Sequence, residues 1–200
     1  MIVIHIPNRF VLKMIDFISP LHYNPVNLKC HIQSSALQVT NVIPKYNDKP
    51  LCIETNVMHI TAGSNKTVVF TFDNLNSNYC SGQLFRAFTN IDHQLISNLA
   101  NAKKLNHDAG QAICTSAISL EKIPQLIARL PDNINDLVLF DQNRNVIDVD
   151  EFTNLNSLFD IHSKGRALLY SRGLRYINLD YKSDWEILSM ELFVTKKNVK

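Results

Sequence analysis

Short apolar runs that alternate with polar residues dominate the first half of the chain. These runs are rich in Val, Ile and Thr and are separated by Pro, Asn, Asp and Gly, which is typical of β-strands joined by turns. They cover residues 28–32, 36–43, 52–60 and 67–72. Before them, apolar residues recur with helical spacing between Phe10 and Ile18, and the Ser19-Pro20 pair is expected to end that helix.

The second half of the chain mixes helical and strand patterns. Apolar spacing predicts a helix after Cys80, another over residues 118–130 and a short one near residues 150–159. Strands are expected at residues 136–140, 145–149, 167–170 and 174–179, whereas residues 185–194 fit either a strand or a helix. Together these elements predict an α+β fold with short mixed strands and several helices packed on a sheet. We expect a single compact domain spanning residues 1–200, with a sub-boundary candidate in the Asn-rich stretch near 73–80.

Composition narrows the class of protein. With 200 residues, of which 46% are hydrophobic and 19% charged, the chain can bury a sizeable core and is too apolar to be disordered. No apolar run approaches the ~20 residues that span a bilayer, and the first seven residues lack the basic start of a signal peptide. We therefore expect a cytoplasmic protein with no membrane insertion.

Cysteines and histidines give no metal site. The four cysteines are Cys30, Cys52, Cys80 and Cys114; they are widely spaced, and no CxxC pair is present. No two of the seven histidines stand three or four residues apart, so no helix offers a ready pair of ligands. Free thiols in a reducing compartment are the simplest interpretation. We expect no metal and no cofactor.

The segment 140–152 resembles the calcium loop of the EF-hand family. Asp141, Asn143 and Asn145 stand at alternating positions, and Glu151 closes the segment where the family has its bidentate Glu. The central Gly is missing and the loop is one residue short, although calcium needs a sharply turning loop of fixed length. A β-hairpin with an Asn-rich turn is the preferred interpretation.

A second resemblance concerns Cys80. A Cys-Ser-Gly sequence that opens a helix, a later Asp-Leu-Val strand at 136–138 and His162 in an Ile-His-Ser sequence resemble the papain-like cell-wall peptidases. That resemblance implies a Cys-dependent hydrolase with Cys80 as its nucleophile, activated at a helix N-terminus. Asn145 occupies the place where that family has its His, which leaves His162 as a substitute base. The preferred interpretation assigns no catalytic residue.

Charge is segregated in the last third of the chain. Residues 132–160 carry a net charge of −6, whereas residues 164–200 carry eight basic and four acidic residues. Tyrosines are interleaved with these bases, and Tyr and Arg are enriched at protein interfaces. The residues predicted to bind a partner are Arg166, Tyr170, Arg172, Arg175 and Tyr176. Strand alternation alone would place Arg172 and Arg175 on opposite faces, unless a turn at residues 171–173 brings them together.

We therefore predict a non-enzymatic intracellular protein-interaction domain, an adaptor or subunit of a larger assembly, with a protein partner. A papain-like hydrolase centred on Cys80 is the first alternative. Nucleic-acid binding through the basic C-terminal segment is the second, because Lys and Arg among aromatic residues also suit phosphates and bases. Residues 118–159 are also similar to ubiquitin-like β-grasp domains and residues 130–143 to a leucine-rich repeat. These resemblances compete for one segment, so the sequence assigns no family.

Overall fold

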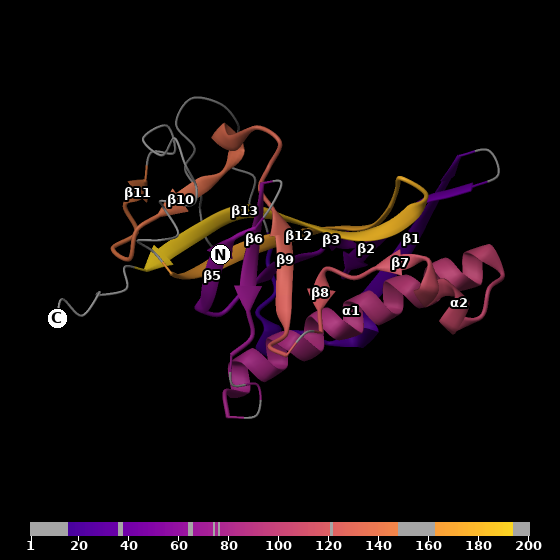
Figure 1. The fold of residues 1–200 in the computed structure, drawn as a ribbon, viewed down its shortest axis with the longest axis horizontal. Coiled ribbons are helices and arrows are strands. Elements are labelled where there is room, and N and C mark those ends of the chain that lie inside the picture. Colours follow the sequence, from indigo (N-terminus) through magenta and orange to yellow (C-terminus); the bar gives the residue numbers. More distant parts are fainter. Residues whose placement is uncertain are drawn as a thin grey trace.

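A computed structural model describes residues 16–35, 38–63, 66–73, 75, 77–120, 122–147 and 163–193. Strands account for 48% of the structure, and there is one long helix. The prediction of an α+β fold with several helices packed on a sheet is therefore wrong. The strands instead close into a five-stranded barrel with extra strands attached (Figure 1).

The barrel is closed by a ring of strand pairs. In the order of pairing, its strands are β5 (Met58–Ala62), β6 (Thr67–Thr71), β9 (Gln125–Arg129), β13 (Asp180–Phe193) and β12 (Lys164–Ile177), which pairs with β5 again. All of these pairs are antiparallel except β9 with β13. Alternation sets the two sides of each strand: Val68, Phe70, Leu126 and Ala128 are buried inside, so their neighbours on β6 and β9 face outward.

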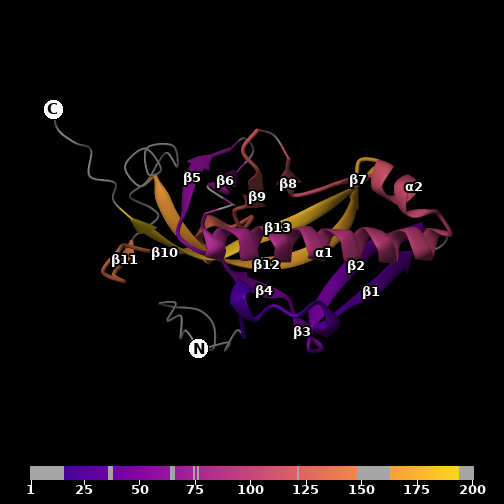
Figure 2. The ribbon, with the colours of Figure 1, turned by 90° about the horizontal axis from the view of Figure 1, so that it is seen from below.

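The hairpin of β12 and β13 is longer than the barrel wall and carries the extra strands. It reverses at Asn178 and Leu179, whose positive φ angles of 52° and 70° suit a tight hairpin turn. At one end β12 pairs with β2 (Gln38–Tyr46), which pairs with β1 (Leu28–Ser35); at the other end β13 pairs with β10 (Val138–Phe140) (Figure 2). The short strands are β3 (Lys49–Pro50), β4 (Cys52–Glu54), β7 (Cys114–Thr115), β8 (Ile118–Ser119) and β11 (Val146–Ile147).

The helix α1 (Tyr79–Lys103) lies lengthwise across the sheet (Figure 2). Asn78 caps its first turn, because its side-chain oxygen accepts a hydrogen bond from the Ser81 amide. Its buried face includes Leu84, Phe88 and Leu95, and the Phe88 ring meets Trp185 of β13 edge to face at 4.6 Å. The remaining helical turns are α2 (His107–Ala112), η1 (Pro20–His22), η2 (Pro25–Asn27) and η3 (Ile134–Asp136).

Several element predictions hold and others fail. The helix after Cys80 and the hairpin near residue 140, formed by β10 and β11, are confirmed. The strands in the first half are confirmed as well, except that residues 52–60 form two strands, β4 and β5, and not one. The helix predicted over 118–130 is wrong, since that segment forms β8 and β9 and its apolar residues alternate across the barrel wall. Residues 167–179 belong to one long strand and not to two, and residues 185–193 are a strand.

Three further predictions concern the undescribed segments, the candidate sub-boundary near 73–80 and the absence of a membrane-spanning helix. The helices predicted at 150–159 and over most of 10–18 lie outside the described residues. The stretch 73–80 connects β6 to α1, and apolar residues on both sides of it, such as Phe72 and Leu84, belong to one hydrophobic core. Among the described helices, none is long and apolar enough to cross a membrane.

Candidate functional site

A hollow lies on the outer face of the barrel, where β6, β9 and the β12–β13 hairpin meet. Its volume is about 380 Å³. Its lining includes Thr67, Ile127, Arg129, Arg175, Ile177 and Lys182. We call this hollow the barrel groove.

Strand register brings these residues together from distant parts of the sequence. Thr67 lies opposite Arg129 in the β6–β9 pair, and Arg175 lies opposite Lys182 in the β12–β13 pair. Ile127 stands two positions before Arg129 on the same outer side of β9, and 40% of its surface is exposed. The groove therefore combines cations with exposed aliphatic surface.

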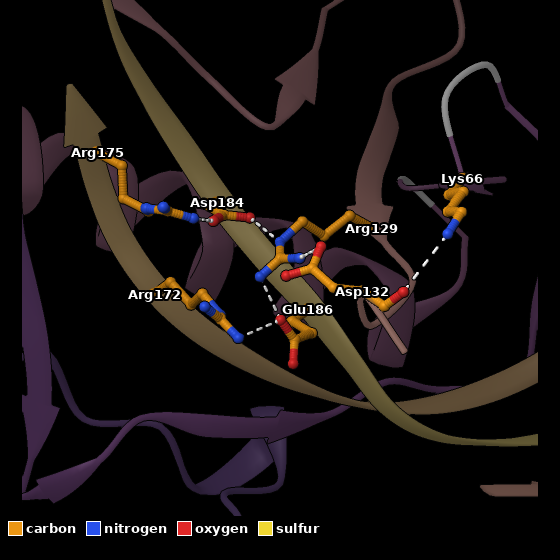
Figure 3. A network of polar contacts seen from close by, with 7 residues as sticks. All are labelled: Lys66, Arg129, Asp132, Arg172, Arg175, Asp184 and Glu186. Carbon is orange, nitrogen blue, oxygen red and sulfur yellow. Dashed lines mark hydrogen bonds and ion pairs between the residues drawn. The ribbon is translucent and has the colours of Figure 1, made fainter. Parts of the chain in front are cut away.

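A network of ion pairs holds the arginines of the barrel groove in place (Figure 3). Arg129 is its centre: its Nε donates to Asp184 Oδ1 at 2.8 Å, its Nη2 donates to Glu186, and its Nη1 donates to Asp132 Oδ1 at 3.2 Å. The carboxylates of Asp184 and Glu186 are almost fully buried. Charges buried in this way are tolerated because they are paired and hydrogen-bonded.

Two further arginines from β12 share the same carboxylates. Arg175 Nη1 lies 2.8 Å from Asp184 Oδ2, and Arg172 Nη2 lies 2.6 Å from Glu186 Oε2. Counting Lys66, which donates to the Asp132 carbonyl at 3.4 Å, and the exposed Lys182, the groove and its network hold five cations. Among the described residues, three carboxylates face them, so this part of the face keeps a positive surplus.

A β-bulge explains why Arg172 and Arg175 lie together. The register of β12 against β13 shifts between Ser171 and Gly173, which reverses the alternation of side chains after that point. Gly173 adopts a positive φ of 83°, where its backbone packs directly against the carbonyl oxygen of Val42. The turn predicted at 171–173 is therefore a bulge inside a continuous strand.

The five residues predicted to bind a partner do not form one patch. Tyr170 stands opposite Glu186, on the side where Arg172 and Arg175 meet their carboxylates. Tyr176 lies on the other side, with its ring 5.0 Å from that of the buried Tyr181. Arg166 is further along β12 and pairs with Glu191 and Glu54.

Sequence reasoning missed several residues of the groove. Arg129 and Ile127 lie inside the segment predicted to be helical, and Thr67 lies in a predicted strand that contains no predicted site residue. The signal that could have revealed them is alternation: Leu126, Ala128 and Leu130 are buried, so Ile127 and Arg129 face outward together.

Within the described residues, no base lies in hydrogen-bond contact with Cys80. Cys80 lies in the first turn of α1, as predicted, but no described histidine hydrogen-bonds to it. His59 pairs with Asp73 at 3.6 Å, and His107 Nδ1 shares a 3.3 Å hydrogen bond with Ser97. His162 lies outside the described residues. Nothing in the described part of the chain assembles a Cys–His pair at Cys80.

The segment that resembles a calcium loop is organised by its own hydrogen bonds. Asp141 Oδ1 accepts from the amides of Asn143 and Asn145, each at 2.8 Å, and Oδ2 accepts from the Asn145 side chain. These bonds, that of the Asn145 side chain first, hold the pKa of Asp141 below its ordinary value. In the described chain, no three His, Cys, Asp or Glu side chains gather as metal ligands would.

Comparison with known proteins finds similarity to solved structures alone. No family model matches the chain, and no curated protein matches it. Three similar solved structures are of the single-stranded DNA-binding protein from bacteriophage Enc34. Its complex with ssDNA matches at TM-score 0.48 and 7% identity over 86% of this chain and 99% of that one. A C-terminal truncation matches at 0.47 and 7% over 84% and 97%, and a further structure at 0.44 and 10% over 86% and 96%.

These findings correct the preferred partner. The chain was expected to be an adaptor that binds protein, with nucleic acid less favoured, yet each of these structures is of a single-stranded DNA-binding protein. With TM-scores of 0.44 to 0.48, the likeness itself assigns neither a family nor a ligand to this chain. The class of ligand is therefore inferred from the residues of the barrel groove.

Proposed function

We propose that the chain binds single-stranded nucleic acid in the barrel groove. The observation that carries this proposal is the positive surplus of the groove beside the aliphatic side chains of Ile127, which is exposed, and Ile177, which is half-buried. Nucleic-acid strands need both: cations for the phosphates and an apolar or planar surface for the bases. In OB-fold barrels, which also have five strands, the face of the second and third strands binds oligonucleotides, and β6 and β9 hold that place here.

The fixed arginines suit a nucleic-acid strand in a second way. The two carboxylate oxygens of Asp184 each pair with one arginine, Oδ1 with Arg129 and Oδ2 with Arg175. The two guanidinium groups are therefore already ordered and lose little conformational freedom when a ligand binds. Bases that have left a stack are bound by stacking on arginine planes as well as on aromatic rings. Lys182, which forms no ion pair within the described chain, remains available for a phosphate.

The concave shape of the groove favours a single strand over a duplex. Proteins that read duplex DNA insert a helix or a β-ribbon into its major groove. The barrel groove is instead a hollow of about 380 Å³ in the protein surface, so a group that projects from the ligand can enter it. An unpaired base projects in this way, whereas a base inside a duplex does not.

Fluorescence anisotropy with labelled single-stranded and duplex oligonucleotides tests the proposal. We expect the single strand to bind more tightly, with an affinity that falls as salt rises. Replacing Lys182 with Gln should weaken binding by about threefold to tenfold and lower the slope of log K against log salt by about 0.7. Lys182 is exposed, so the folded structure should be unaffected.

A matched control comes from the far end of α1. Lys104 lines neither the barrel groove nor its network and adopts a left-handed conformation that Asn accepts well. Lys104→Asn therefore removes the same charge without strain and should leave the affinity unchanged. Equal effects of the two substitutions, or no binding by the unchanged protein, would contradict the proposal.

We further propose that the protein is cytoplasmic and acts as a single domain. Its four cysteines are free thiols, a state that a reducing compartment maintains.

A further inference from the structure

A second cavity lies at the opposite end of β6 from the barrel groove. Its volume is about 210 Å³. Its lining includes His59 of β5, Thr71 of β6, Lys164 of β12 and, from the start of α1, Asn78 and Ser81. We call it the β6-end cavity.

The two hollows are connected along one strand. Thr67 lines the barrel groove and Thr71 lines the β6-end cavity, and both lie on the outer side of β6, because Val68 and Phe70 are buried inside. Four residues of a β-strand span about 13 Å. A strand that fills the barrel groove and continues along β6 therefore reaches this cavity.

The chemistry of the β6-end cavity suits an anion. Lys164 is exposed and has no ion pair within the described residues, and it stands opposite His59 in the β5–β12 pair. Thr71 and Ser81 supply hydroxyl groups. The acid in the lining is Asp73, whose carboxylate lies 3.6 Å from the His59 ring. Among the described residues, no carboxylate forms an ion pair with Lys164, so its ammonium group can contact a ligand.

We propose that the β6-end cavity binds a backbone phosphate of the same nucleic-acid strand that occupies the barrel groove, so that the strand runs along β6. This inference rests on the proposed function and adds the path that the bound strand takes across the protein surface. It makes the contribution of Lys164 depend on the length of the ligand. An oligonucleotide that fills the barrel groove alone does not reach Lys164, whereas a longer one does.

The test compares two oligonucleotides, one of about three nucleotides and one of about twelve, which fall below and within the usual site sizes of such barrels. Lys164→Gln should weaken binding of the longer one by about threefold and lower its salt slope by about 0.7. Binding of the shorter one should not change. Lys182→Gln should weaken both, and Lys104→Asn neither. A thermal melt of each variant checks that its fold is intact.

The outcomes separate the two proposals. If the unchanged protein binds neither oligonucleotide, the proposed function fails, and the strand path fails with it. If both bind and Lys164→Gln weakens both equally or neither, the proposed function stands and the path along β6 is overturned.

Discussion

Asp92 lies on the buried face of α1 and ties that helix to the strand that carries the barrel groove. Its Oδ1 accepts a 2.8 Å hydrogen bond from Ser183 of β13, and its Oδ2 accepts one from Ser116. Ser183 stands between Lys182 and Asp184 of the groove. Burial raises the pKa of Asp92, and its hydrogen bonds to the two serines offset this effect only in part. The neutral carboxyl is therefore the form that the fold favours.

This raised pKa predicts how stability depends on pH. Because the folded pKa of Asp92 lies above its unfolded value near 3.8, its favourable contribution is present in full below that value. The contribution is lost as the pH rises through the folded pKa. Asp92→Asn cannot ionise, so the stability of this variant relative to the original protein should increase as the pH rises from about 4. Urea unfolding across this range measures the difference, and a difference that stays constant with pH would refute the assignment.

Glu186 gives a second prediction at the residue scale, with effects of opposite sign on stability and binding. Its buried carboxylate accepts from Arg129 and Arg172. Glu186→Gln keeps one acceptor oxygen but removes a negative charge, which should cost about 1–3 kcal/mol of stability. The larger positive surplus should raise the affinity for a single-stranded oligonucleotide by about threefold at low salt. Denaturant unfolding and anisotropy together check both signs, and weaker binding by a folded variant would argue against phosphate contact at this face.

At the scale of elements, the bulge in β12 determines which side chains reach the groove. It lets β12 pass close to β2 and reverses the alternation, so that Arg172 and Arg175 contact neighbouring carboxylates. Both effects depend on Gly173. A Cβ atom there would lie 1.9 Å from the Val42 carbonyl oxygen, and the positive φ disfavours any side chain.

Gly173→Ala should therefore destabilise the protein by at least about 2 kcal/mol, from backbone strain and the contact with Val42. Gly82, in the first turn of α1, is the comparison: its Cβ would come within 3.1 Å of a single backbone oxygen, and its backbone is helical. Gly82→Ala should change the stability far less. Chemical denaturation of the two variants measures the contrast, and equal losses would show that the bulge does not need Gly173.

At the scale of the whole molecule, local patterns predicted elements but not their closure into a barrel. The strands of the first half and the helix after Cys80 follow from short-range alternation and spacing. Closure depends on pairs such as Gly165 with Met58, which are over a hundred residues apart and leave no local signal. The prediction of a helix over 118–130 failed because its apolar residues fit either period, and pairing with β6 decided the outcome.

The candidate site could be predicted only in part for the same reason. The basic segment that begins at Lys164 supplies Arg172 and Arg175, which were predicted to bind a partner, and also Lys182, which was counted only among its eight basic residues. The pattern could not reveal that a bulge joins two of them, or that β9 adds Arg129 at the centre. Nor could it show that Asp184 and Glu186, from the same segment, would neutralise much of its charge.

The order of the barrel strands along the chain also has a consequence for synthesis. The strands that close the ring, β12 and β13, come after the other barrel strands, β5, β6 and β9, in the sequence. Until β12 and β13 have emerged, β5 and β9 each pair with β6 alone and lack their second barrel partner, and open strand edges of this kind pair readily with other chains. The barrel therefore cannot close until the chain has been synthesised as far as residue 193, and until then the nascent chain is exposed to aggregation. A chaperone that shields β5 and β9 during this interval would raise the yield of folded protein without changing its final stability.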